Sequence, residues 1–392
     1  MYALLLAIIY LAFISLGLPD SLLGSAWPSM QQQMMVPISY AGIISMLIAG
    51  GTIVSSLLSD RLTKKWGAGL VTATSVLLTA AALLGFSFSH SFWILCLWAL
   101  PYGLGAGAVD AALNNYVALH YAARHMSWLH CFWGVGAAVS PYIMGYCLGS
   151  GFGWEGGYRI IGIAQILLTA LLFLSLPLWK RQGSATQEKL GTDAPILPLR
   201  VILRMTGVPH VLLAFFCYCA LETTTGLWAG SYLVLGKGVP AQAAAQYVSF
   251  FYLGITAGRF LCGFAANRIG DKNMIRIGIA FMLVGIGVVW LPTSVDGICL
   301  CGLLIIGLGC APVYPSIIHA TPGNFGTENS QAVVGVQMAS AYAGATFMPP
   351  LFGLAANYIS IGLYPAFLLF FAALILVMTE TLNKKVSADR LK

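Results

Sequence analysis

Long apolar runs, separated by short polar or glycine- and proline-containing segments, fill the chain almost from one end to the other. Only 8% of the residues are Asp, Glu, Lys or Arg, whereas roughly 25% is usual in soluble domains. A soluble fold cannot bury so much apolar side chain, since 59% of the residues are hydrophobic. A helix that spans a bilayer needs about 20 apolar residues. The sequence therefore predicts a polytopic all-α membrane protein, and it excludes a soluble enzyme, a nucleic-acid binder and a receptor with a large ectodomain.

The apolar runs and the glycines and prolines between them predict twelve membrane-spanning helices. Their expected ranges are 3–27, 37–59, 68–89, 92–120, 127–149, 157–179, 207–235, 241–266, 274–292, 297–319, 330–356 and 362–380. One long polar stretch, residues 180–206, lies at the middle of the chain. We therefore expect an N-terminal six-helix bundle (1–179), a linker loop (180–206) and a C-terminal six-helix bundle with a short tail (207–392).

The cations are distributed unevenly between the two sides of these predicted helices. If both termini are cytoplasmic, Arg159 and Lys237 fall near the outer side and Arg259 falls within a helix, whereas every other Lys and Arg lies in an inner loop or the tail. Cytoplasmic loops carry an excess of Lys and Arg, so both termini and the linker are expected in the cytoplasm. This bias explains the net charge of +7 without nucleic acid. Short loops and the lack of Asn-x-Ser/Thr sites favour a bacterial inner membrane.

The two predicted halves repeat each other in sequence at offsets of 204 to 208 residues. The matching segments are SSLLSDRLTKKWG (55–67) with CGFAANRIGDKNM (262–274), Gly103-Leu104-Gly105 with Gly307-Leu308-Gly309, and Pro141 with Pro349. Two parallel repeats of six helices are a layout found in secondary transporters. The sequence therefore predicts two pseudo-symmetric six-helix bundles.

The repeated loops carry charged residues in corresponding places. Asp60 and Arg61 after the second predicted helix are echoed by Asn267 and Arg268 after the eighth. An acid at a helix end can pair with Arg and with a neighbouring helix N-terminus, which would hold one alternating-access state. This pattern resembles the loop signature of the major facilitator superfamily, although a plain cluster of cytoplasmic cations is the alternative. The resemblance implies a conformational latch made of Asp60, Arg61, Lys65, Arg259, Arg268, Asp271 and Lys272.

Longer segments narrow the resemblance to one branch of that superfamily. These segments are GLPDSLLGSAWP (17–28), YGLGAGAVDAALNNYV (102–117), WLHCFWGVGAAVSP (128–141), CALETTTGLWAGSYLV (219–234) and GITAGRFLCG (254–263). They are similar to the fucose-permease-like sugar–proton symporters. The resemblance implies a major facilitator fold, a monomer, a sugar as the small-molecule substrate and a proton, rather than sodium, as the coupling cation.

Three carboxylates lie well inside predicted spans: Asp20, Asp110 and Glu222. A charged side chain at the bilayer centre costs about 3 kcal/mol or more, so such residues are functional candidates by default. Pro19 interrupts the helix beside Asp20 and frees backbone groups around its carboxylate. We interpret all three as proton-coupling residues, and in the resembling family an Asp at the place of Asp20 takes part in coupling. The structural alternatives are a carboxylate bound to unwound backbone, an interhelical clamp and, for Glu222, an ion pair with Arg259.

The predicted helix 92–120 places Asn114 one turn after Asp110, so both face the same way, whereas Asn115 points about 100° away. Such a set of donors and acceptors suits a polyhydroxylated substrate. The resembling family has a glutamate in place of Asp110, where it serves coupling and substrate binding, so the shorter aspartate changes the reach. For His130 and Gln337 the alternatives are a helix cap and a structural hydrogen bond. The predicted substrate-binding residues are Asp110, Asn114, Asn115, His130, Trp133, Tyr142, Trp228, Gln337 and Tyr342.

These features predict a secondary active transporter that imports a monosaccharide such as fucose, galactose or glucose together with a proton. Two alternatives stay open: proton-driven efflux of amphipathic small molecules, and sodium-coupled sugar transport, because an acid at the place of Glu222 looks like the related sodium-coupled glucose transporters. The nine cysteines lie almost entirely in apolar runs, and no nucleotide loop, metal-ligand spacing or nucleophile motif occurs. We therefore expect no enzymatic activity, no cofactor and no metal.

Overall fold

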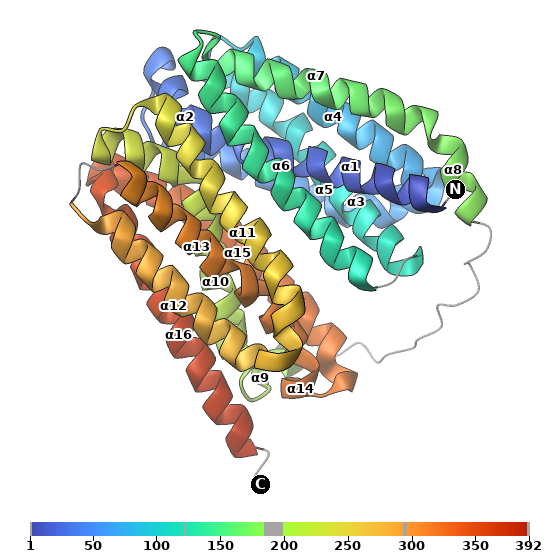
Figure 1. Cartoon of the computed structure of the whole chain (residues 1–392). Helices are drawn as coiled ribbons and strands as arrows, with labels where there is room; N and C mark the ends of the chain where they lie inside the picture. The colour runs from blue at the N-terminus through green and yellow to red at the C-terminus, as the bar shows by residue number, and fades with distance from the viewer. Residues whose placement is uncertain (1, 121–122, 184–198, 293–295, 390–392) are drawn as a thin grey trace. The chain divides into compact units, whose positions relative to one another are not determined.

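The computed structural model describes residues 2–120, 123–183, 199–292 and 296–389. Within these ranges every regular element is a helix, which confirms the predicted all-α class (Figure 1). The helices of the first half are α1 (Tyr2–Asp20), α2 (Leu22–Met34), α3 (Tyr40–Trp66), α4 (Ala68–Ser87), α5 (Phe92–His120), α6 (Ala123–Gly149), α7 (Gly153–Leu174) and α8 (Leu176–Gly183).

The second half repeats this pattern of long helices joined by short connections. Its elements are α9 (Leu199–Arg204), α10 (Val208–Ser231), the π-helix η1 (Tyr232–Gly236), α11 (Ala241–Ile269), α12 (Asp271–Trp290), α13 (Asp296–His319), α14 (Thr321–Phe325), α15 (Thr327–Tyr358), the 3-10 helix η2 (Ile361–Leu363) and α16 (Tyr364–Asp389).

The described helices account for the twelve predicted spans. Ten segments are long and apolar enough to cross a membrane, and the first of them, Leu4–Met34, combines α1 and α2. The other two predicted spans correspond to α3, whose apolar part is Tyr40–Ser56, and to α15. The first span is longer than predicted, because the chain resumes its helix after a single turn residue, Ser21, and continues to Met34.

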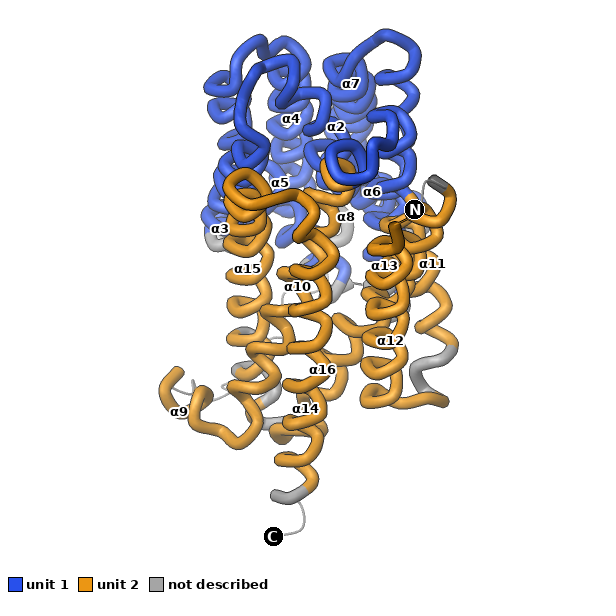
Figure 2. Tube along the Cα trace, turned by 90° about the vertical axis from the view of Figure 1, so that its left-hand side faces the viewer, with its two compact units in different colours: residues 1–191, 233–249 blue, residues 192–232, 250–392 orange. Residues whose placement is uncertain are grey.

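The chain divides into two compact units, which Figure 2 distinguishes by colour. Unit 1 comprises residues 1–191 and 233–249, and unit 2 comprises residues 192–232 and 250–392. Each unit contains its own buried interior, so each is described by itself below.

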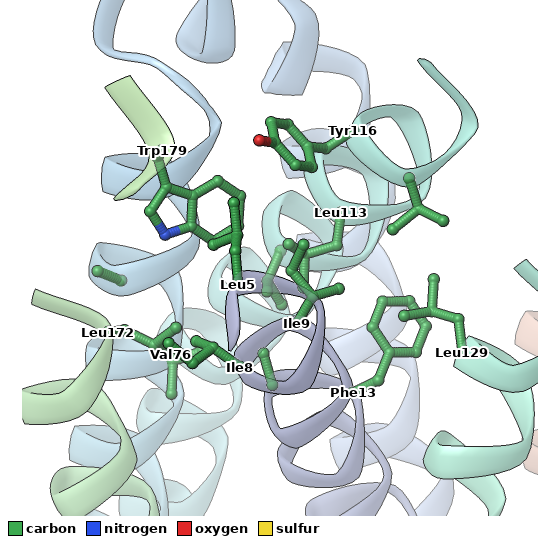
Figure 3. Close-up of a cluster of buried hydrophobic side chains, with 14 residues drawn as sticks. Leu5, Ile8, Ile9, Phe13, Val76, Leu113, Tyr116, Leu129, Leu172 and Trp179 are labelled. Carbon is green, nitrogen blue, oxygen red and sulfur yellow. The ribbon is translucent and has the colours of Figure 1, made fainter. Parts of the chain in front are cut away.

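The core of unit 1 surrounds α1. Figure 3 shows side chains at positions 5, 8, 9 and 13 of this helix packed among side chains from α4 to α8. The buried members are Leu5, Ile8, Ile9, Ala12, Phe13, Ala73, Val76, Val109, Leu113, Tyr116, Val117, Leu129, Leu172 and Trp179. Because lipid is as apolar as leucine, close packing rather than transfer from water holds such a core together. This packing fixes α1, the helix that ends in Asp20.

Glycines place the helices in the same way in both units. Any Cβ at Gly103 of α5 would collide with the backbone of α3, and any Cβ at Gly307 of α13 would collide with the backbone of α11. Gly105 and Gly309 lie equally close to α4 and α12. The repeat predicted from the sequence is therefore present in the packing: α3, α4 and α5 correspond to α11, α12 and α13.

A second pair of glycines extends this correspondence. Gly136 of α6 lies against the backbone of α1 at Ile14, and Gly344 of α15 lies against the backbone of α10 at Phe216. Small residues at such crossings let helix backbones approach closely in membranes. The packing of α6 on α1 brings Trp133, three residues before Gly136, to the end of α1.

Candidate functional site

The Asp20 carboxylate is held by two aromatic side chains from different helices. Trp133 of α6 donates its indole N–H to Oδ2 at 2.8 Å, and Tyr102 of α5 donates its hydroxyl to Oδ1 at 3.0 Å. The side chain of Asp20 is accessible, although it lies within a membrane-spanning segment. Each carboxylate oxygen thus accepts a hydrogen bond from a neutral donor. If the carboxylate takes up a proton, that proton can occupy the place of one of these two donors.

A missing backbone donor explains how the end of α1 is positioned. Pro19 has no N–H, so the Ser15 carbonyl four residues earlier lacks its usual helical donor. The buried Gln165 of α7 supplies one, since its Nε2 lies 2.6 Å from the Ser15 oxygen. Thr79 of α4 then donates to Gln165 Oε1 at 2.9 Å. Three helices therefore meet at one amide and hold Asp20 in place.

The junction between α1 and α2 is also tied to α6. The hydroxyl of Ser21 donates to the Ala137 carbonyl at 2.7 Å and lies 2.8 Å from the Ser140 hydroxyl. Both serine side chains are buried. The helix interruption expected beside Asp20 is thus one residue long, and its residue Ser21 supplies a donor to the Ala137 carbonyl, which Pro141 leaves without its usual helical donor.

A second carboxylate lies in the same polar region of unit 1. Asn114 Nδ2 donates to Asp110 Oδ1 at 2.9 Å and to the Asp110 carbonyl oxygen at 3.0 Å, so the two side chains share one face of α5. Asp110 is partly buried, and its charge interacts with that of Asp20. Like charges repel more strongly in a medium of low dielectric constant than in water, so a proton on either carboxylate relieves the other.

Other predicted residues of unit 1 lie along the same helices. The ring of His130 contacts Phe13 edge-on, with centroids 5.9 Å apart, and it is exposed. Tyr142 is exposed on α6. The side chain of Asn115 lies outside the described part of the structure. Their roles in substrate binding stay predictions.

Sequence reasoning missed Tyr102 and Gln165. Tyr102 precedes Asp110 by eight residues, slightly more than two helical turns, so the two lie on neighbouring faces of α5. That spacing was the available signal for Tyr102. The role of Gln165 follows from the proline on another helix, and nothing in the local sequence of α7 indicates it.

In unit 2 the predicted acid Glu222 pairs with Arg259. Arg259 Nη2 of α11 lies 3.4 Å from Glu222 Oε1 of α10, and each side chain is 17% exposed. Tyr218, one helical turn before Glu222 on α10, donates its hydroxyl to the Cys310 carbonyl at 3.0 Å. The structure thus contains the ion pair that was the structural alternative for Glu222, and a coupling role stays a prediction.

The remaining predicted binding residues of unit 2 differ in accessibility. Trp228 is buried and donates its indole N–H to the Pro349 carbonyl at 2.8 Å. Gln337 is buried and accepts a hydrogen bond from Thr321 at 3.1 Å. Tyr342 is exposed. Trp228 and Gln337 therefore hold helices of unit 2 together, and their contact with substrate stays a prediction.

The residues of the predicted latch are only partly described. The side chains of Asp60 and Arg61 lie outside the described part of the structure, and Lys65 is exposed over the ring of Trp66. Arg268 and Lys272 are exposed. Asp271, the first residue of α12, binds His319 Nδ1 of α13 through its Oδ2 at 2.8 Å. Among the described residues no group of three or more His, Cys, Asp or Glu could hold a metal ion.

Replacing Gln165 by Leu is expected to lower the free energy of unfolding by about 1–3 kcal/mol, because it leaves the buried Ser15 carbonyl unsatisfied, whereas the Thr79 hydroxyl keeps the Val76 carbonyl as its acceptor. Thermal unfolding in detergent micelles measures the loss. The matched control is Thr169→Val, since the Thr169 hydroxyl donates to a carbonyl of its own helix. Equal destabilisation by the two changes would contradict the proposed support of α1.

Repeated helix bundles with carboxylates inside membrane-spanning segments are typical of membrane transporters. The chain belongs to the Major Facilitator Superfamily, whose model matches residues 9–339 and, in a second match, residues 248–389. Its helices have the twelve-helix fold of this superfamily.

Two relatives of the chain are distant from it in sequence. The chain is 23% identical over 286 residues to Bypass of stop codon protein 6 of Saccharomyces cerevisiae, covering 67% of this chain and 56% of the yeast protein. It is 21% identical over 312 residues to the glucose/mannose transporter GlcP of Bacillus subtilis, covering 78% and 77% of the two chains. The chain thus spans little more than half the length of the yeast relative.

A solved structure shows the same fold. The crystal structure of a mutant of the nucleoside transporter NupG superposes with a TM-score of 0.77, covers 96% of this chain and 98% of its own, and is 15% identical. At this identity the likeness establishes the architecture and leaves the substrate open.

Proposed function

We propose that the protein is a proton-coupled symporter of the fucose-permease-like branch, and that it imports a monosaccharide such as fucose, galactose or glucose. The observation that carries this proposal is the accessible Asp20 carboxylate, bound on its two oxygens by Tyr102 and Trp133 within a membrane-spanning segment. The similarity to a glucose/mannose transporter supports a sugar as the substrate class.

Protonation of Asp20 changes which groups can bind one another. A carboxylate only accepts hydrogen bonds, whereas a carboxylic acid uses one oxygen as a donor. Tyr102 can turn its hydroxyl and accept instead, but the indole N–H of Trp133 can only donate. A proton on Oδ2 therefore frees Trp133 to donate to a sugar hydroxyl, and its ring can stack on a sugar face.

The second carboxylate, Asp110, links the protonation of Asp20 to the charge of the site. Asp110 interacts electrostatically with Asp20, and Asn114 supplies an amide beside it. One proton halves the negative charge of the pair, and the amide and carboxylate then bind substrate hydroxyls. A ligand can shift a conformational equilibrium only through different affinities for the two states. Proton and sugar together meet that condition, because each improves the site for the other.

The cation distribution and the repeat support further features of the proposal. We infer a bacterial inner-membrane protein with cytoplasmic termini, acting as a monomer. Its functional halves are residues 1–179 and 207–392, joined by the loop 180–206. Residues of the two repeated loops, Asp60, Arg61, Lys65, Arg268, Asp271 and Lys272, act as the latch together with Arg259.

Sugar-dependent proton entry tests the proposal. The purified protein is reconstituted in sodium-free liposomes that contain a pH-sensitive dye, and fucose, galactose, glucose and related sugars are added one at a time. We expect internal acidification with at least one sugar. If no sugar causes internal acidification, and the protein is shown to be folded and inserted, sugar–proton symport is contradicted. A response that requires added sodium would support sodium-coupled transport instead.

Replacing Trp133 by Phe is expected to raise KM roughly 2- to 10-fold, since the ring remains but the proposed indole hydrogen bond to a sugar hydroxyl, worth about 0.5–1.5 kcal/mol, is lost. Initial rates of sugar uptake measure the change. The matched control is Trp128→Phe on the same helix, whose ring contacts His125 edge-on. An unchanged KM in Trp133→Phe would show that the indole N–H of Trp133 does not bind the sugar.

A further inference from the structure

The short helix α9 has an apolar and basic surface outside the membrane-spanning segments. It ends at Arg204, before the span that begins at Val208, and it packs on α10 and α15. Within α9 the side chain of Ile202 is buried, and the other five side chains are exposed. Ile202 therefore attaches α9 to unit 2, and most of the surface of this helix is left for another partner.

The register of α9 places its two arginines together on the outward side. Arg200 and Arg204 are one turn apart, so they lie side by side, roughly 160–200° around the helix from the buried side chain. Leu199 and Leu203 flank them on one side and Val201 on the other, with exposed fractions of 57%, 42% and 48%. Cations beside large exposed aliphatic side chains are typical of helices that lie in a membrane interface.

The corner between α9 and α10 rests on the last turns of α16. A Cβ at Gly207 would lie 2.7 Å from Leu382 Cδ1 and 3.6 Å from Val386 Cγ2. Lys384 and Lys385 lie between these two contact residues in the sequence, and both are exposed. Figures 1 and 2 place α9 at the end of unit 2 toward which α16 extends to the C-terminus. Two lysines thus join the two arginines at one end of unit 2.

A carboxylate at this end of α16 is surrounded by cations. Glu380, one turn before Lys384, accepts two hydrogen bonds from Arg276, at 2.6 Å and 2.8 Å, and it also interacts electrostatically with Lys272 and Lys384. Three cations around one carboxylate leave positive charge at this end of unit 2. Anionic phospholipids of a cytoplasmic leaflet attract basic residues that lie next to a membrane-spanning helix.

We propose that α9 and the last turns of α16 bind an anionic phospholipid, with Arg200 and Arg204 on its phosphate and the exposed aliphatic side chains of α9 against its acyl chains. The planar fork of a guanidinium matches two phosphate oxygens, and Lys384 and Lys385 add positive charge. The aliphatic side chains favour a lipid over a soluble phosphate, because only a lipid can cover them. The bound lipid holds the segment before α10 at the membrane surface.

Lipid binding to the purified full chain tests this inference. The protein in detergent is titrated with phosphatidylglycerol, phosphatidylcholine or inorganic phosphate, and native mass spectrometry identifies what remains bound. We expect the first phosphatidylglycerol to bind at least about 10-fold more tightly than phosphatidylcholine, since each cation near the surface favours an anionic lipid. Arg200→Gln with Arg204→Gln should remove most of this preference. Lysine at both positions keeps the charge but loses the planar fork, so it should remove a smaller part.

Two further double variants separate charge from apolar contact. Leu199→Gln with Leu203→Gln keeps all the cations, and it should weaken the binding of phosphatidylglycerol because the acyl chains lose their contact. The matched control removes two cations from the predicted outer side, Arg159→Gln with Lys237→Gln, and should keep the preference for the anionic lipid. The midpoint of thermal unfolding verifies that each variant is folded.

The outcomes decide between a lipid and a soluble anion. Equal binding of the two lipids, or a preference for phosphatidylglycerol that survives the loss of both arginines, would overturn the inference. Inorganic phosphate that binds through the same arginines, and that phosphatidylglycerol does not displace, would identify a site for a soluble anion instead. These measurements involve no solute uptake, so their failure leaves the proposed sugar–proton symport standing.

Discussion

Replacing Asp20 by Asn is expected to reduce proton-driven uptake to the level of protein-free liposomes. The amide neither ionises nor becomes protonated near neutral pH, although its oxygen can accept from Trp133 and its nitrogen can donate to the Tyr102 hydroxyl. Exchange of labelled for unlabelled substrate across the membrane needs no net movement of protons. We therefore expect this exchange to remain measurable, which separates a loss of coupling from a loss of binding.

Asp110→Asn tests the second carboxylate in the same two assays. Because Asp110 interacts with Asp20 and positions Asn114, we expect it to impair exchange as well as net uptake. The matched control is Glu155→Gln, an acid at the start of α7 that accepts a hydrogen bond from Gln33 at 2.7 Å. For the first variant, Asp20→Asn, full proton-driven uptake would show that Asp20 takes no part in coupling.

Replacing Gly136 by Leu is expected to prevent stable folding of unit 1. The new Cβ would collide with the Ile14 carbonyl of α1, and the reciprocal change Gly17→Leu would collide with the Trp133 carbonyl of α6. The colliding atoms belong to the backbone, so no side-chain rotation relieves them. We expect a loss of more than about 3 kcal/mol, the upper end for overpacked interiors.

The effect is measured by the monodispersity of the purified protein in detergent and by the midpoint of its thermal unfolding. The matched control is Gly50→Leu, since a Cβ at Gly50 of α3 would have no neighbour within 4 Å. If Gly136→Leu and Gly50→Leu unfold at the same temperature, the close crossing of α1 and α6 does not set the stability of unit 1.

The fold could be read from the sequence because its determinants are local or repeated. Apolar runs of membrane length define the spans, and the glycines that recur in helices α5 and α13 mark the same backbone crossings in both units. Several boundaries differed by a few residues or more. At the first span, α2 extends the helix to Met34, because the helix resumes after Ser21 instead of ending near Trp27.

The candidate site could be read only in part. Asp20, Asp110 and Glu222 stand out because charges are rare in apolar spans, and Asn114 follows from helical spacing. The partners on other helices do not follow, since the rotation of one helix against another is set by packing. Tyr102 and Gln165 reach the site from α5 and α7 for that reason.

The partner of Arg259 on another helix also could not be predicted from the sequence. The sequence left open whether it pairs with a carboxylate or belongs to a latch, and the structure places it against Glu222. The distance between the two charged groups and their partial burial, which no sequence pattern specifies, came from the structure.

The central claim is that the solute moves together with a proton, and the steady-state accumulation ratio tests it most directly. Sodium-free proteoliposomes are held at zero membrane potential with a potassium ionophore, and a gradient of about one pH unit, acid outside, is imposed. One proton per solute molecule predicts about 10-fold accumulation inside, because a tenfold proton gradient and a tenfold solute gradient represent equal free energies. A ratio that stays at one while solute enters would show facilitated diffusion and contradict the account.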